Sequence, residues 1–101
     1  MAKLTKLAET SDIPPGEGRV IEAEGKTLAV FNVDGTFYAI DNTCLHRGGP
    51  LGEGELAGTI VTCPWHAWQY DVRTGEAVFD PGVRVETYPV RVEGDDVLVE
   101  V

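Results

Sequence analysis

Every cysteine and histidine of this 101-residue chain lies in one of two short segments, residues 44–54 and 63–70. In each segment a cysteine precedes a histidine by two or three positions. Glycine and proline are frequent around these pairs, and such loops let the backbone curl closely around a metal while its amides turn inward. The candidate metal ligands are Cys44, His46, Cys63 and His66. The fold must therefore bring these two loops together.

Outside these segments the sequence is typical of β-structure. Short runs rich in Val, Ile, Thr, Phe and Tyr, some of them alternating, predict strands with one buried face. These runs cover residues 19–24, 27–33, 36–40, 59–62, 84–92 and 97–101. Asp34-Gly35 suits a tight hairpin, because the central positions of such a turn need positive φ. We expect a compact all-β sandwich or partly open barrel of antiparallel strands, with the two loops at one tip.

The length and charge of the chain narrow the possible functions. A chain of 101 residues predicts one domain, residues 1–101, with a single modest core and no room for a separate catalytic domain. Eight basic and seventeen acidic side chains give a net charge of -9, which excludes nucleic acid and favours partners with basic surface. The N-terminus has no apolar targeting segment and no stretch is long enough to cross a membrane, so we expect a cytoplasmic protein without a membrane partner.

Two cysteines without a secretory signal indicate thiols or metal ligands rather than a disulfide. Zinc accepts two thiolates and two imidazoles, but zinc sites usually pair their ligands as C-x2-4-C or H-x3-5-H. In an iron–sulfur centre, thiolates favour Fe(III), whereas a neutral imidazole makes its iron accept an electron more easily. The mixed ligand set therefore favours an asymmetric redox centre, and a structural zinc-binding interaction module is the alternative.

The spacing C-x-H, sixteen residues, then C-x2-H resembles that of the Rieske family. The resemblance is most specific over residues 43–70 and looser through to Val92. It implies one Rieske-type 2Fe-2S cluster, with the two cysteines on the inner iron and the two histidines on the outer, solvent-near iron. The other positions that fit the family's loop pattern are Gly48, Leu51, Gly54 and Pro64.

The chain departs from the family pattern in three ways. Family members usually have glycine after the second histidine, whereas this chain has Ala67, which fits if that backbone position has negative φ. High-potential Rieske proteins have a disulfide between the loops, and this chain lacks the cysteines for it. Those proteins also place Ser and Tyr as hydrogen-bond donors to sulfur, where this chain has Trp68 and Tyr70. Fewer donors stabilise the reduced cluster less, so we predict a low-potential, ferredoxin-like protein in which Tyr70 offsets part of the loss.

Side chains near the loops carry further expectations. The tip is expected to present few charges and the apolar residues Leu45, Pro50, Leu51, Pro64 and Trp65. For the aromatic residues Trp65, Trp68 and Tyr70, packing against the sheet is the expected role. Asp71 and Arg73 are expected to lie in solvent.

A cluster at the tip of a small domain acts as an electron port, so we expect an electron-transfer component and not an enzyme. Among Rieske relatives, a terminal oxygenase subunit needs a further catalytic domain and a quinol-oxidising subunit needs a membrane anchor. The resemblance therefore implies a free-standing, monomeric ferredoxin that carries electrons from a flavin-dependent reductase to a ring-hydroxylating or related oxygenase. The small subunit of an NADH-dependent nitrite reductase, with the same fold and size, is the alternative.

Overall fold

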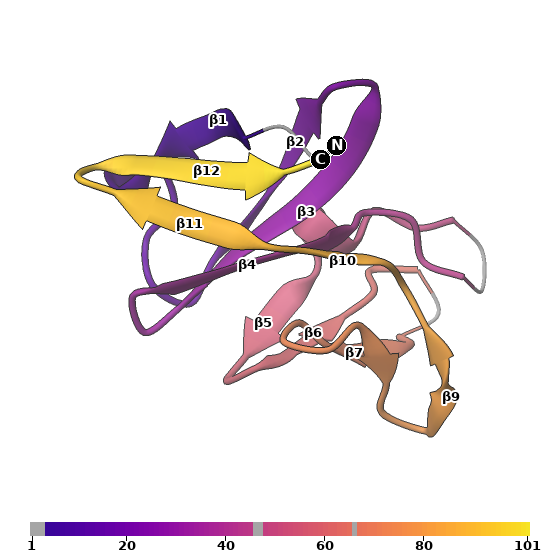
Figure 1. The fold of residues 1–101 in the computed structure, drawn as a ribbon. Helices are drawn as coiled ribbons and strands as arrows, with labels where there is room; N and C mark the ends of the chain where they lie inside the picture. The colour runs from indigo at the N-terminus through magenta and orange to yellow at the C-terminus, as the bar shows by residue number, and fades with distance from the viewer. Residues whose placement is uncertain (1–3, 46–47, 66) are drawn as a thin grey trace.

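The computed structural model describes residues 4–45, 48–65 and 67–101, which form three antiparallel sheets without an α-helix (Figure 1). The first sheet has the order β1 (Leu4–Glu9), β12 (Asp96–Glu100), β11 (Val90–Glu93). The second has the order β10 (Thr87–Tyr88), β4 (Thr36–Asp41), β3 (Lys26–Val33), β2 (Gly18–Ala23). The third has the order β5 (Glu55–Ala57), β6 (Ile60–Thr62), β7 (Gln69–Asp71), β8 (Glu76–Ala77), β9 (Asp80–Arg84). Two short 3-10 helices, η1 (Thr10–Asp12) and η2 (Leu51–Glu53), lie in the connections.

The all-β prediction is confirmed, and the three sheets of the described chain do not close into a barrel. Five of the predicted runs correspond to β2, β3, β4, β6 and β12 within one residue at either end. The predicted hairpin joins β3 to β4, where Val33 pairs with Thr36. Asp34 and Gly35 between them have φ of 50° and 93°, the left-handed backbone that a two-residue hairpin turn requires.

The prediction of one continuous strand over residues 84–92 is wrong. The chain leaves the third sheet at Arg84, pairs briefly with β4 as β10, and then joins β12 as β11. Pro89 lies between β10 and β11, and proline has no N–H to donate to a ladder, so the chain changes sheets there. The runs also miss β1, whose register shifts between Lys6 and Ala8, the very short strands β5, β7 and β8, and all of β9 except Arg84.

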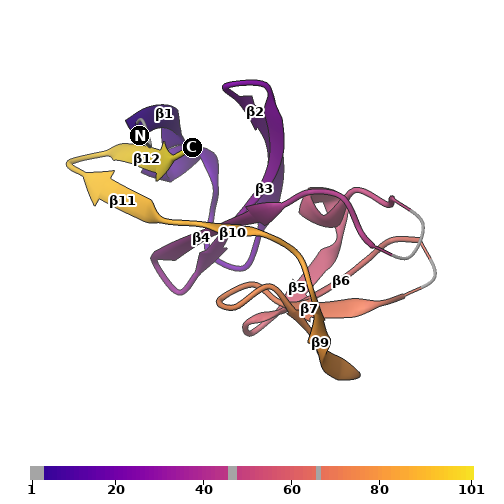
Figure 2. The same ribbon diagram turned by 45° about the vertical axis from the view of Figure 1, so that its right-hand side comes forward.

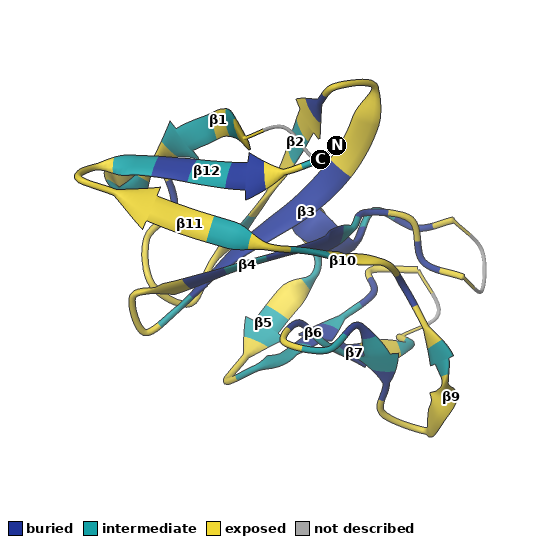
Figure 3. Ribbon diagram, viewed as in Figure 1, coloured by how far each residue is buried: buried dark blue, intermediate teal, exposed yellow. Residues whose placement is uncertain are grey.

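Strand β3 is exposed at Lys26 and Thr27 and buried over residues 28–32, the dark blue part of the strand in Figure 3. This part is buried because its alternating side chains enter two hydrophobic clusters. Leu28 and Val30 pack in the cluster beneath the first sheet, with Val97 and Val99 of β12. Ala29 and Phe31 face the other cluster. That second cluster also contains Ile40, Cys44, Leu51, Val61, Cys63 and Tyr70. The two cysteines are therefore buried in a hydrophobic cluster to which β3 and β4 of the second sheet also contribute side chains.

The prediction that Leu51 is exposed at the tip is wrong, because its side chain is fully buried in this second cluster. Helix η2 turns the chain back toward β2 and β3, which removes Leu51 from the tip. Leu45 is exposed at 54%, as expected for the tip. Trp65 is exposed at 51%, which agrees with its expected place at the tip but not with the expected packing of its ring against the sheet.

Two loops extend from the same end of the molecule, on the right of both ribbon views (Figures 1 and 2). One connects β4 to η2 and the other connects β6 to β7. In the residues that the structure describes, no helix has the length and apolar character needed to span a membrane.

Candidate metal centre

The two loops at this end carry the predicted ligands, and each is closed by its own backbone hydrogen bonds. In the first loop the N–H of Cys44 donates to the carbonyl of Gly49 (3.0 Å) and the N–H of Gly48 donates to the carbonyl of Cys44 (2.7 Å). In the second loop the N–H of Cys63 donates to the carbonyl of Trp68 (2.7 Å). The backbone at each cysteine is thus fixed by hydrogen bonds within its own loop.

Cys44 and Cys63 form no disulfide, are exposed by only 1% and 2%, and have side chains that interact with each other. The structure therefore brings together two of the four predicted ligands. The other two, His46 and His66, lie outside the described residues. Among the described residues, no group of three or more His, Cys, Asp or Glu side chains is placed to hold a metal ion.

Gly49 allows the two loops to approach each other. A Cβ atom at this position would lie 2.7 Å from the sulfur of Cys63 and 3.1 Å from the Cβ and Cγ atoms of Trp65. Any side chain would collide with the second loop, so only glycine lets the backbone of the first loop pass beside the Cys63 sulfur. Sequence reasoning treated the loop glycines as a group and missed this role.

Hydrogen-bond donors point at both sulfurs. The backbone N–H of Trp65 donates to Sγ of Cys63 (3.4 Å). The hydroxyl oxygen of Tyr70 accepts from the N–H of Leu45 (3.2 Å) and lies 3.5 Å from Sγ of Cys44. Because a thiolate has no proton to give, Tyr70 is the donor toward a Cys44 thiolate. Such donors stabilise negative sulfur, as a metal-bound cluster requires.

Burial controls the protonation of these groups. It raises the pKa of the Cys63 thiol, and the neighbouring Cys44 adds to the rise, while the hydrogen bond from the Trp65 N–H opposes it. Burial also raises the pKa of Tyr70, which keeps its hydroxyl protonated and able to donate. A buried thiol with a raised pKa becomes a thiolate when a metal cation supplies the opposing charge.

Asn42 fixes the start and the end of the first loop, a role that the sequence reasoning missed. Its N–H donates to the carbonyl of Thr27 (3.1 Å), and its own carbonyl accepts from the N–H of Leu51 (2.8 Å). Its buried side-chain oxygen accepts from the N–H of Gly52 (2.7 Å). The available signal was an asparagine directly after a strand, where its side chain commonly replaces a backbone partner.

Three predictions about neighbouring side chains need correction. Ala67 has φ of 61°, so the condition of a negative φ under which alanine would fit is not met, and this backbone costs an L-residue about 1–2 kcal/mol. Trp65 is half-exposed rather than packed against the sheet, whereas Trp68 is partly buried and meets the ring of Phe79 edge-on at 4.7 Å. Asp71 is only 19% exposed, because its carboxylate pairs with Arg73 (2.8 Å), which lowers the pKa of Asp71.

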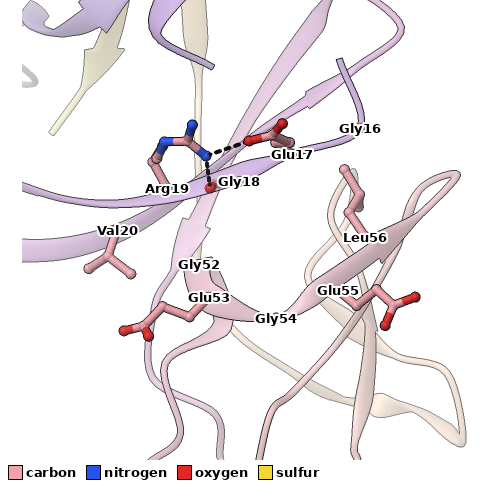
Figure 4. Close-up of a pocket in the computed structure, with 10 residues that line it drawn as sticks. All are labelled: Gly16, Glu17, Gly18, Arg19, Val20, Gly52, Glu53, Gly54, Glu55 and Leu56. Carbon is pink, nitrogen blue, oxygen red and sulfur yellow. Dashed lines mark hydrogen bonds and ion pairs between the residues drawn. The ribbon is translucent and has the colours of Figure 1, made fainter. Parts of the chain in front are cut away.

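Surface pockets lie apart from the cysteines. Three pockets have volumes of about 400, 460 and 450 Å³, and the described residues that line them do not include Cys44 or Cys63. One of them lies between β2 and the segment from η2 to β5 (Figure 4). Its cation, Arg19, is already paired with the carboxylate of Glu17 (2.9 Å) and with the carbonyl of Gly18 (2.8 Å). This pocket has no unpaired cation to attract an acidic ligand.

A family model described as the Rieske [2Fe-2S] domain matches residues 3–89, which include both loops. The chain belongs to this Rieske family. Its cofactor is accordingly one Rieske-type 2Fe-2S cluster, which argues against the zinc alternative. The two buried thiols, the donors aimed at their sulfurs and the close approach of Gly49 fit such a cluster.

Rieske proteins of dioxygenase systems are similar to this chain over nearly its whole length. The biphenyl dioxygenase ferredoxin subunit of Pseudomonas sp. (strain KKS102) is 39% identical over 98 residues, covering 95% of this chain and 90% of that protein. A solved complex of reduced oxygenase and oxidized ferredoxin in carbazole 1,9a-dioxygenase contains a chain with 34% identity and a TM-score of 0.88, covering 96% of this chain and 92% of that one. A Mycobacterium tuberculosis protein assigned as an NADH-dependent nitrite reductase small subunit has a TM-score of 0.92 at 24% identity, with 100% and 96% coverage, and so shares the fold.

Replacing Tyr70 with phenylalanine is expected to lower the reduction potential of this Rieske protein by roughly 40 mV, the equivalent of about 1 kcal/mol for one electron. The hydroxyl lies 3.5 Å from the Cys44 sulfur, which becomes more negative on reduction, so its loss destabilises the reduced state more than the oxidised state. A redox titration followed by visible absorbance measures the shift. Tyr88→Phe is the matched control. Tyr88 lies on β10, where its ring contacts Lys26 of β3, and the loss of its hydroxyl should leave the potential unchanged. Equal potentials for Tyr70→Phe and the wild type would show that the hydroxyl does not act on the cluster.

Proposed function

We propose that this Rieske protein is an electron carrier that passes electrons from a flavin-dependent reductase to a ring-hydroxylating or related oxygenase. The observation that carries the proposal is the pair of buried cysteines that meet where the two loops come together, in a chain similar to ferredoxins over nearly its whole length. In the carbazole system, the solved complex pairs such a ferredoxin with its oxygenase. The proposed role is electron transfer without catalysis of its own.

The proposed ligands are Cys44 and Cys63 for one iron and His46 and His66 for the other. The cluster supplies reversible one-electron chemistry when it is bound. Cys44 and Cys63 are buried, and the donors at Tyr70 and at the Trp65 backbone face their sulfurs, which supports their part of the assignment. The two histidines are assigned from their spacing in the sequence.

The surface near the loops suits brief association with a partner. Leu45, Pro64 and Trp65 are exposed there, while the whole chain carries a net charge of -9. An apolar contact allows close approach, and an acidic body steers toward a basic partner without making the complex permanent. We expect association with both the reductase and the oxygenase to weaken as salt rises.

A monomeric state, a cytoplasmic location and a single domain over residues 1–101 stay predictions from the sequence.

The nitrite reductase alternative is less well supported. The similarity to the Mycobacterium tuberculosis protein, at 24% identity, concerns the fold. Two ferredoxins of dioxygenase systems are 39% and 34% identical to this chain. We therefore favour the free carrier.

The test is the EPR spectrum of anaerobically prepared protein after reduction by dithionite, with iron, sulfide and zinc quantified on the same sample. We expect a rhombic signal with an average g of about 1.9, below that of an all-cysteine cluster, and two irons per chain. Oxygenase turnover should then depend on this protein when a flavin reductase and NADH are supplied. An EPR-silent sample with one zinc would overturn the electron-carrier proposal. A normal signal without electron delivery to any oxygenase would leave a cluster protein with a different partner.

A further inference from the structure

We propose that Trp65 is a positioning residue that clasps the first loop against the second and shields the Cys63 sulfur from water. This proposal rests on the proposed function, in which Cys63 is a cluster ligand. Three groups define the clasp: the Trp65 side chain, the Gly49 backbone and the Cys63 sulfur. A Cβ atom at Gly49 would lie 2.7 Å from that sulfur and 3.1 Å from Cβ and Cγ of Trp65, so the three groups meet at one point.

In the proposed function the cluster joins the two loops, because Cys44 and Cys63 bind the same iron. Cys44 and Cys63 form no disulfide, so without the cluster the loops are held together by non-covalent contacts of the described residues. The hydrogen bonds from Cys44 to Gly49, from Gly48 to Cys44 and from Cys63 to Trp68 each lie within one loop. The Trp65–Gly49 contact joins one loop directly to the other, and Tyr70 of β7 adds a second contact through the N–H of Leu45.

The exposure of the two side chains indicates what Trp65 covers. Trp65 is 51% exposed, yet the neighbouring Cys63 is 2% exposed. The Cβ and Cγ atoms of Trp65 lie beside Gly49 at the Cys63 sulfur, and Trp65 as a whole is 51% exposed. A large aromatic side chain contributes apolar contact in this position, and its removal would open a path for water to the sulfur.

Two consequences follow for a bound cluster. Without the indole ring the loops can separate more easily, so iron is lost faster. Water at the Cys63 sulfur would also stabilise the additional negative charge of the reduced cluster, so the potential would rise. If Trp65 had no role beyond the surface, its removal would change neither the rate of iron loss nor the reduction potential. If Trp65 were needed only for folding, its removal would leave the potential of the intact cluster unchanged.

The experiment compares Trp65→Ala, Trp65→Phe and the wild-type holoprotein. We expect Trp65→Ala to lose its visible absorbance roughly fivefold faster in the presence of an iron chelator, because the apolar contact between the loops is gone. Its reduction potential should shift upward. Trp65→Phe keeps an aromatic ring against Gly49 and should restore both properties to near the wild-type values. Val92→Ala is the control for removal of an exposed apolar side chain, since Val92 is 45% exposed and lies on β11, away from the loops.

The outcomes separate this proposal from the function on which it rests. A wild-type protein without the rhombic EPR signal would overturn the proposed function and the clasp together. A wild-type protein with that signal, and a Trp65→Ala variant with unchanged iron loss and potential, would overturn the clasp alone. If that variant lost only its electron transfer to a partner, Trp65 would be a docking residue and the clasp would again be wrong. If Trp65→Ala failed to assemble a cluster while Trp65→Phe and Val92→Ala assembled one normally, the need for a ring against Gly49 would be supported.

Discussion

Replacing His66 with cysteine is expected to lower the reduction potential of the cluster by roughly 200 mV while some cluster is retained. With two thiolate and two neutral imidazole ligands, the oxidised cluster has a formal charge of zero. A third thiolate makes that charge -1, so the added electron meets greater repulsion. A redox titration gives the potential, and the EPR spectrum of the reduced variant should move toward that of an all-cysteine cluster.

The control for this variant is a cysteine that is added elsewhere. Ser11→Cys introduces a thiol in η1, outside the two loops, and should leave the potential and the spectrum unchanged. Unchanged redox behaviour in His66→Cys would refute the assignment of His66 as a ligand. That assignment depends on spacing and ligand chemistry, because His66 lies outside the described residues.

Replacing Gly54 with alanine is expected to lower the free energy of unfolding by about 3 kcal/mol, enough to impair assembly of the protein. The new Cβ atom would overlap the carbonyl oxygen of Thr62 and would lie 3.0 Å from Cγ2 of Val61. Both obstacles belong to β6, the strand that leads into the second loop, so neither can move without disturbing Cys63. Urea denaturation of the holoprotein, followed by circular dichroism, measures the change.

The backbone of Gly54 has φ of -75°, which suits any L-residue, so the expected loss comes from the collision and not from a forbidden conformation. Gly82→Ala is the matched control. A Cβ atom there would meet the Asp80 carboxylate at 3.2 Å, and that side chain lies in an exposed part of the chain and can adjust. The control should change the free energy of unfolding by less than about 0.5 kcal/mol. If Gly54→Ala were as stable as Gly82→Ala, the close packing of the first loop on β6 would be wrong.

The sequence predicted well those features that depend on residues close together in the chain. The hairpin at Asp34-Gly35 needs two adjacent residues that accept positive φ, and both have it. The two candidate ligand segments were predicted from an equally local pattern, a histidine two or three positions after each cysteine, and the assignment of these ligands stays a prediction. Strands β3 and β4 are continuous apolar runs, so their limits were found within one residue.

Features that depend on tertiary contacts were not predictable in this way. Leu51 lies close to the loop in the sequence, but η2 turns it into the core. The proximity of Gly49 to Cys63 and Trp65 joins positions more than a dozen residues apart, and no local pattern encodes it. The positive φ of Ala67 is imposed by the second loop against the preference of alanine itself. Pro89 was a local signal for a break in the strand, which the alternating valines around it obscured.

Strand β3 has one face in each hydrophobic cluster and so affects how cooperatively the protein unfolds. Neither cluster can melt without exposing one side of the same strand, so the two halves of the domain should unfold in a single transition. The slowest amide hydrogen exchange is then expected along Lys26–Val33. A destabilising substitution in the cluster that contains Val97 and Val99, remote from the loops, should also shorten the lifetime of the iron centre.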